Sequence, residues 1–408
     1  MNILVLDTIH GGNVITDAFR ARGDRVDAVD VYRHTSEIDT STALSRTYDL
    51  IVAPVHLDPD HPLVTRINAP IITHHEAVRQ LLGGRVPKIF VEITGSRGKT
   101  TTAHALASVM PGPGILHTSS GTFQYPEKIL LSRSSITPAS VLAVVERAHA
   151  IHGWLIAEES LGVTGAGSLC IITSAGDYRC AAGKKDARAA KLASARSCRR
   201  LLLAEGIPDP DAGPAGAVHS ETVASWSGTE CSVTIDGKTR KFSNPLMTLP
   251  AYQDSLVLAA TAALMLGVDP APLASFGTLP GRMSERYEDG VLVIDNANSG
   301  TTRSTTIDAA QYARQRSGST DLTLVIGQQK GDGAVCEGFA PDQIAAAINA
   351  IRPIRVIYVG TQDGPIVSGS AATGPADETS VPTLEAGFAR AREITPSGSI
   401  VLAVKTWR

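Results

Sequence analysis

The sequence has 408 residues, of which 43% are hydrophobic and 19% are charged, and its formal net charge is -3. Because a domain typically holds about 100–200 residues, this length predicts two to four domains, each able to bury its own core. The near-neutral charge argues against a general nucleic-acid-binding protein, which would carry a basic excess. No stretch approaches the roughly 18 continuous apolar residues of a membrane span, and no basic region precedes the first apolar run, as it would in a signal peptide. We therefore expect a cytoplasmic protein with no nucleic-acid partner and no membrane partner.

The cysteines are too few, too scattered and of the wrong parity for a disulfide framework. None forms a C-x-x-C pair, so a structural zinc site is not expected. We interpret all of them as scattered structural thiols: Cys170, Cys180, Cys198, Cys231 and Cys336.

The apolar runs at the start of the chain predict a small α/β unit. Short runs rich in β-branched residues at 2–6, 49–53 and 70–72 are expected to be strands, and helical patterns lie between them. This alternation is typical of parallel sheets that are covered by helices.

Two further units of the same kind follow along the chain. In the second, strands are expected at residues 88–93, 154–157 and 169–173, with an Ala/Leu-rich helix over 254–266. In the third, strands are expected at residues 291–295, 322–327, 355–360 and 400–404. With breaks near Pro87 and Ser284, the sequence predicts three domains, residues 1–86, 87–284 and 285–408.

A glycine-containing loop follows the strand predicted at 88–93, and a helical run follows the loop. Backbone N–H groups at such a helix start point at the occupant of the loop, for which polyphosphate is the natural candidate. Lys99 would place its charge on the β- and γ-phosphates of ATP, and the hydroxyl of Thr100 or Thr101 would coordinate Mg²⁺. Since Ile93 stands where the complete motif has its first glycine, a glycine-rich turn capped by a threonine is the alternative. The predicted nucleotide-binding loop is Gly95, Ser96, Arg97, Gly98, Lys99, Thr100 and Thr101.

A phosphate loop also requires a carboxylate that holds the metal ion, usually at the end of a neighbouring strand. The apolar run at 154–157 leads directly into Glu158 and Glu159. Carboxylate oxygens are the ligands that Mg²⁺ prefers, so we predict Glu158 as its ligand. The alternative is a solvated strand end.

The loop from Gly95 to Thr101 resembles the G-T-x-G-K-T-T loop of the Mur ligase superfamily, and Glu158-Glu-Ser160 resembles its Mg²⁺-binding E-x-S segment. The resemblance implies a three-domain α/β architecture, with a central P-loop ATPase domain between two Rossmann-like domains. It implies that ATP activates a substrate carboxylate as an acyl phosphate, which a nucleophile then attacks. It is also consistent with a monomer or a homodimer.

Further segments of the chain resemble the same superfamily. Lys191 falls in a segment whose lysine is carbamylated in many members, where it supports a second Mg²⁺, although Tyr178 replaces a metal-binding histidine there. Arg282 would contact phosphate, Asp295 would contact ribose, and Lys330 would reach the active site on domain closure. The alternatives are solvated lysines at 191 and 330 and a simple turn at Gly281-Arg282.

Histidines follow all three strands predicted in the N-terminal unit: His10, His56 and the pair His74-His75. Open α/β sheets bind ligands beyond the carboxyl ends of their strands, so these residues are candidates for contacting an acidic substrate. The alternative for Thr73-His-His-Glu76 is a capping box that leaves both histidines exposed in the first turn of a helix.

Four segments together resemble the coenzyme F(430) synthetase branch of the superfamily, found in methanogenic archaea: I-L-V-L-D-x-x-H-G-G, T-H-H-E, G-S-R-G-K-T-T-T and S-A-G-D-Y. This resemblance implies that ATP phosphorylates a propionate of a nickel tetrapyrrole seco-acid. An internal carbon nucleophile then closes the last carbocyclic ring, and ADP and phosphate are released. The alternatives are a Mur-type ligase that joins an amine to a carboxylate and a P-loop binding module without ligase activity.

Overall fold

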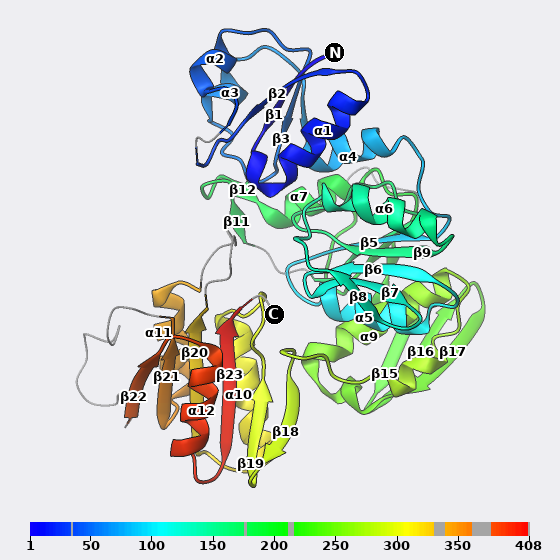
Figure 1. Ribbon diagram of the computed structural model, residues 1–408. Helices are drawn as coiled ribbons and strands as arrows, with labels where there is room; N and C mark the ends of the chain where they lie inside the picture. The colour runs from blue at the N-terminus through cyan, green and yellow to red at the C-terminus, as the bar shows by residue number, and fades with distance from the viewer. Residues whose placement is uncertain (34–35, 175–177, 211–215, 330–338, 361–376, 407–408) are drawn as a thin grey trace. The chain divides into compact units, whose positions relative to one another are not determined.

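The computed structural model describes residues 1–33, 36–174, 178–210, 216–329, 339–360 and 377–406 (Figure 1). The chain forms two compact units, Met1–Phe276 and Gly277–Arg408. No helix in these described ranges is long and apolar enough to cross a membrane.

The first unit begins with a parallel four-stranded sheet in the order β2-β1-β3-β4. Its strands are β1 (Asn2–Leu6), β2 (Arg25–Val29), β3 (Leu50–Ala53) and β4 (Ile71–Thr73). The sequence predicted all but β2, whose first and third residues, Arg25 and Asp27, are polar and break the apolar run. Helices cover both faces of this sheet. Alternate strand residues point to opposite faces, and apolar side chains are buried on each face. They are α1 (Asn13–Ala21), α2 (Thr40–Leu44), α3 (Pro62–Thr65) and α4 (His74–Leu82).

Helix α4 begins as the sequence predicted. The hydroxyl of Thr73 accepts from the backbone N–H of Glu76, and the Glu76 carboxylate accepts from the backbone N–H of Thr73, which completes a capping box. The helix ends at Gly83, whose φ of 56° lies in the left-handed region that glycine tolerates.

The second sheet of this unit has eight strands in the order β14-β13-β10-β5-β9-β6-β7-β8. It is parallel up to β6, and the strands β7 and β8 continue it antiparallel. Its strands are β5 (Phe90–Thr94), β6 (Gly114–Thr118), β7 (Gly121–Tyr125), β8 (Ile129–Ser132), β9 (Trp154–Glu158), β10 (Leu169–Ile172), β13 (Leu201–Leu203) and β14 (Val218–His219). The sequence predicted β5, β9 and β10, the fully buried apolar strands at its centre.

Helices and two small antiparallel sheets complete the first unit. Helix α9 pairs closely with α5, and its almost continuous burial explains why it is Ala/Leu-rich. The remaining elements are α5 (Lys99–Val109), α6 (Ser140–Ala150), β11 (Arg179–Cys180), β12 (Lys185–Asp186), α7 (Ala187–Ala195), α8 (Ser220–Val223), β15 (Ala224–Ser227), β16 (Glu230–Ile235), β17 (Lys238–Ser243) and α9 (Pro250–Met265).

The second unit is a six-stranded sheet in the order β18-β19-β23-β20-β21-β22, in which only β18 is antiparallel to its neighbour. Helix α12 packs on one face of this sheet through Leu384 and Ala391. The elements are β18 (Ser284–Glu288), β19 (Val291–Asp295), α10 (Arg303–Ser317), β20 (Leu322–Gln328), α11 (Pro341–Ile351), β21 (Arg355–Val359), β22 (Asp377–Val381), α12 (Leu384–Ile394) and β23 (Ser399–Lys405). The predicted α/β class is confirmed.

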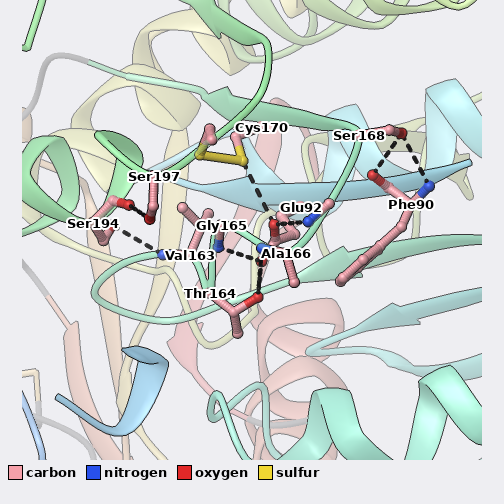
Figure 2. The surroundings of a disulfide bond; sticks show 12 residues. Phe90, Glu92, Val163, Thr164, Gly165, Ala166, Ser168, Cys170, Ser194 and Ser197 are labelled. Atoms are coloured by element: carbon pink, nitrogen blue, oxygen red, sulfur yellow. Dashed lines mark hydrogen bonds between the residues drawn. A yellow bond between two sulfur atoms is a disulfide. The ribbon is translucent and has the colours of Figure 1, made fainter. Parts of the chain in front are cut away.

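The interpretation of every cysteine as an isolated thiol is wrong. Cys170 on β10 and Cys198 after α7 form a disulfide, with their Cα atoms 6.1 Å apart (Figure 2). The crossover from β10 through α7 to the adjacent strand β13 brings back a residue 28 positions away, which no local spacing reveals. Cys180 and Cys231 are buried, and Cys336 lies outside the described residues.

Candidate active site

The loop between β5 and α5 has the geometry of a phosphate-binding loop. Gly95 has a φ of 149°, and a Cβ there would collide with the hydroxyl of Thr173, so only glycine fits. Gly98 caps α5 in the left-handed region, and no side chain caps the helix. The threonine-capped turn considered as the alternative is therefore wrong. Backbone N–H groups at the helix start remain available to an anion.

The end of β10 supports this loop from the neighbouring strand. The Ser174 hydroxyl accepts hydrogen bonds from the backbone N–H groups of Ser96, at 3.0 Å, and Arg97, at 3.1 Å. The Thr173 hydroxyl donates to the Arg97 carbonyl at 2.6 Å. Sequence reasoning missed both residues as parts of the site. Their signal was present, since two hydroxyl residues directly follow a fully buried apolar strand.

Lys99, Thr100 and Glu158 meet where β9 ends beside α5. The Lys99 ammonium lies 3.8 Å from Glu158 Oε1 and donates to the Gly95 carbonyl at 3.0 Å. The Thr100 hydroxyl donates to Glu158 Oε2 at 2.8 Å, and the backbone N–H of Ser119 donates to the same oxygen at 3.0 Å. Glu158 is 2% exposed. The solvated strand end considered for Glu158 is therefore wrong.

The side chains of Thr100 and Glu158 fit a Mg²⁺ ion in donor type. Both offer hard oxygen atoms, one hydroxyl and one carboxylate, and both lie at the mouth of the phosphate loop. Sequence reasoning did not find Ser119, whose backbone orients the carboxylate from the turn between β6 and β7. Backbone contacts of this kind carry no side-chain signal.

Glu159 occupies a different environment, although it follows Glu158 directly. It is fully buried, and burial together with the charge of nearby Glu92 raises the pKa of its carboxyl well above its ordinary value. Glu92 on β5 accepts hydrogen bonds from Thr164 and from the backbone N–H groups of Gly165 and Gly167 (Figure 2). Cys170 Sγ lies 3.6 Å from the same carboxylate. The acid pair predicted from the sequence thus separates into a carboxylate at the phosphate loop and a fully buried carboxyl with a raised pKa.

Lys191 on α7 is 2% exposed, so the alternative of a solvated lysine is wrong. Its ammonium lies 4.6 Å from the centre of the Tyr178 ring, a cation–π distance. The tyrosine that replaces a superfamily histidine therefore lies against this lysine.

The four candidate histidines separate into two pairs. His74 and His75 are 2% and 3% exposed, so the expectation that a capping box leaves them exposed is wrong. The His74 Nε2 atom lies 2.9 Å from the Leu6 carbonyl oxygen, and His75 Nε2 lies 3.0 Å from that of Ser160. Burial lowers the pKa of each imidazole to about 4, so both rings are neutral near pH 7. His10 and His56 are partly exposed, at 23% and 28% of their side chains.

The remaining candidates lie in the second unit. Asp295 is the last residue of β19, is 6% exposed, and accepts from the backbone N–H of Ala297 at 3.1 Å. Arg282 is partly buried, in a turn closed by its own N–H to the Leu279 carbonyl. Lys330 lies outside the described residues.

Comparisons with known proteins agree with this geometry. Residues 285–406 match a family described as "Coenzyme F430 synthetase CfbE, C-terminal domain". The chain is similar to the coenzyme F(430) synthetase of Methanosarcina acetivorans, with 29% identity over an alignment that covers 100% of this chain and 98% of that relative.

Solved structures establish the fold. FolC of Escherichia coli, in complex with DHPP and ADP, is similar with a TM-score of 0.55 and 14% identity, over 82% of this chain and 90% of that one. The UDP-N-acetylmuramate-alanine ligase of Thermotoga maritima is similar with a TM-score of 0.52 and 16% identity, over 99% of this chain and 95% of that one.

The fold is similar to that of Mur-type ligases, and the phosphate loop with the full-length similarity to a synthetase supports an ATP-dependent ligase. Within that class, the similarity that runs along the whole chain is to coenzyme F(430) synthetase. Both resemblances predicted from the sequence motifs are thereby confirmed.

Proposed function

We propose that this ligase phosphorylates a propionate side chain of a nickel tetrapyrrole seco-acid with ATP, and that an internal carbon nucleophile of the same molecule then closes the last carbocyclic ring. ADP and phosphate are the other products. The observation that carries the proposal is a complete phosphate loop, with Lys99 and Thr100 on Glu158, in a chain similar over its whole length to a coenzyme F(430) synthetase.

The residues of the phosphate loop supply positioning and charge. Backbone N–H groups between Gly95 and Thr101 hold the phosphates, and Lys99 neutralises charge on the γ-phosphoryl group during its transfer. Thr100 and Glu158 would hold Mg²⁺, which supplies charge neutralisation between the phosphates when bound. An internal nucleophile requires only that the two ends of one substrate are held together, so no second pocket for an amine is needed.

The other predicted residues complete the proposal. We propose that Lys191 supports the metal-binding region, that Arg282 contacts phosphate and that Asp295 contacts ribose. Lys330 would reach the active site on domain closure. The supporting observations are the burial of Lys191 and the position of Asp295 at the carboxyl end of a central strand. We also propose the domains 1–86, 87–284 and 285–408, which agree with three separate main sheets and with the family match that begins at residue 285.

The substrate would lie at the carboxyl edge of the N-terminal sheet. His10 and His56 are partly exposed there, whereas His74 and His75 hold the framework behind them. Of the four histidines, we therefore assign substrate contact to His10 and His56. The chain has a net charge of only -3 and no strong overall field, so local groups of this kind would have to hold an acidic macrocycle.

The test incubates purified protein with ATP, Mg²⁺ and the nickel seco-acid, and follows both ADP release and the chromophore spectrum. We expect ADP to form with the seco-acid alone, in step with the spectral change. Turnover that requires a peptide-like carboxylate plus an amine would instead establish an amide-forming ligase. Nucleotide binding without ADP formation on any carboxylate would establish a binding module.

A further inference from the structure

Three ligand-type side chains converge at the carboxyl edge of the N-terminal sheet, outside the phosphate loop. Asp7 follows β1, His10 lies in the turn after it, and His56 follows β3. One ligand atom from each of the three lies within 4.8 Å of the others. His10 Nδ1 is 2.7 Å from Asp7 Oδ2, and His56 Nε2 is 3.3 Å from the same oxygen.

The Asp7 carboxylate is built into this position. It is fully buried, and its Oδ1 atom accepts from the backbone N–H groups of Ile9 and His10, so Oδ2 is left to face the imidazoles. Burial alone would raise the pKa of Asp7, but its interactions with His10 and His56 outweigh that effect and hold the pKa below its usual range. Within the described residues, Asp7 forms no ion pair with a lysine or arginine. The Oδ2 atom of this buried carboxylate therefore faces the imidazole nitrogens of His10 and His56.

One ring nitrogen of His56 is not used in a hydrogen bond within the described chain. Its Nε2 atom is buried and makes no hydrogen bond of acceptable geometry within the described chain, although Asp7 Oδ2 is near. The ring is held in place by stacking on Tyr32, at 5.7 Å between centres and 17° between planes. His10 meets both rings edge-on. The rings are thus oriented by their neighbours, as the ligands of a metal site are.

We propose that Asp7 Oδ2, His10 Nδ1 and His56 Nε2 bind a divalent transition-metal ion of the zinc, cobalt or nickel class. Two imidazoles and one carboxylate are the donor set of such ions, whereas Mg²⁺ prefers oxygen ligands only. Three protein ligands leave further coordination positions open, at an edge of the sheet where His10 and His56 are partly exposed.

The ion bound here is a free ion rather than the nickel of a tetrapyrrole. A macrocycle occupies four positions of its metal and leaves one axial position on each face, so it could take only one of the three donors. Binding at His10 Nδ1 replaces its contact with Asp7, and a neutral His10 then carries its proton on Nε2. The site shares His10 and His56 with the substrate contact proposed above, but Zn²⁺ binding is measured without ATP or seco-acid, so its failure would not bear on the proposed ligase activity.

The test uses the full-length protein without a polyhistidine tag, stripped with a chelator and then titrated with Zn²⁺ by calorimetry. We expect one ion to bind per chain, and His10→Ala and His56→Ala each to weaken binding by at least about tenfold. His149→Ala, which removes an exposed imidazole on α6, is the matched control and should bind like the unchanged protein.

Substitution with Co²⁺ gives a readout that does not depend on affinity alone. The absorption bands of the bound ion should change in His10→Gln and His56→Gln, variants that keep a polar side chain and are checked for folding by circular dichroism. The proposal is overturned if the stripped protein shows no saturable binding. It is equally overturned if the histidine variants bind Zn²⁺ like the unchanged protein, since the ion would then occupy another site such as Glu158.

Discussion

Glu158 and Glu159 are neighbours in the sequence but belong to two different regions of the protein. Consecutive residues of a strand face opposite sides of a sheet, so Glu158 faces α5 and the phosphate loop, whereas Glu159 faces Glu92 and the loop behind it. Lys99, Thr100 and a backbone N–H surround Glu158. Glu159 has no lysine or arginine at this distance in the described chain, and its charged neighbour is Glu92.

This comparison teaches that the partners of a buried carboxylate decide its protonation and its use. A carboxylate beside a cation and two hydrogen-bond donors is placed to hold a metal ion, whereas burial beside another acid raises the pKa of a carboxyl and favours its protonated form. We therefore expect changes on the α5 side to reduce turnover while stability is kept, and changes on the opposite side to reduce stability while turnover is kept.

The largest effect is expected from Lys99→Ala. Loss of the ammonium removes charge neutralisation from the transferring phosphoryl group and should lower kcat by about 1,000-fold. ADP release in the presence of the nickel seco-acid measures this loss, and a urea unfolding curve serves as the control. Wild-type turnover in this variant would contradict the role of the loop.

Removal of the disulfide should give the next largest effect, and on stability alone. Cys170 and Cys198 close a loop with a sequence separation of 28, for which chain entropy predicts a stabilisation of about 3–4 kcal/mol. The unchanged protein should therefore unfold at lower urea when dithiothreitol is added, and the Cys170→Ala/Cys198→Ala variant should not respond to the reductant. Equal unfolding midpoints in both redox states would show that this bond contributes nothing.

Glu158→Gln should lower kcat by about 100-fold, because the neutral amide weakens the hold on Mg²⁺ next to Thr100. The required Mg²⁺ concentration should rise at the same time, which a titration of ADP release against Mg²⁺ would show. Glu159→Gln is the matched control, since the same substitution one residue further lies on the other side of the strand. Similar losses of turnover in the two variants would show that Glu158 and Glu159 do not differ in function.

Glu159→Gln should have no large effect on turnover and should act instead on the pH dependence of stability. The pKa of Glu159 is raised in the folded state, so the folded protein retains a proton that the unfolded chain releases above its ordinary value of 4.5. Stability is therefore complete below that pH and falls as pH rises toward the folded pKa, by up to about 1.4 kcal/mol per unit. Unfolding by urea at a series of pH values above 4.5 should show this slope in the unchanged protein and lose it in the variant. A slope of the same size in both proteins would assign it to another group.

Sequence reasoning found the features that depend on local order along the chain. Each of these features can be predicted from a few consecutive residues. They are the apolar strands β1, β5, β9 and β10, the phosphate loop and the Thr73–Glu76 capping box. The class of fold follows from the same alternation.

The features that it missed depend on residues far apart in the chain. His74 and His75 are buried only because the Leu6 and Ser160 carbonyls receive their rings. The disulfide depends on the crossover between β10 and β13, and the support of the phosphate loop by Ser174 depends on the pairing of β10 with β5. None of these contacts can be predicted from the spacing of residues in the sequence, because only the tertiary structure brings the partners together.

The burial of His74 and His75 lowers the folding stability of the first unit as the pH falls, whereas Glu159 lowers it as the pH rises. With folded pKa values of about 4, both imidazoles stay neutral while those of the unfolded chain take up protons near the ordinary value of 6.5. Stability is complete above that pH and declines as pH falls toward 4, because protonation would place charge on a buried His75 Nδ1 that has no partner in the described chain. The two contributions act in opposite directions: stability falls as pH drops below about 6.5 because of the histidines, and falls as pH rises above about 4.5 because of Glu159.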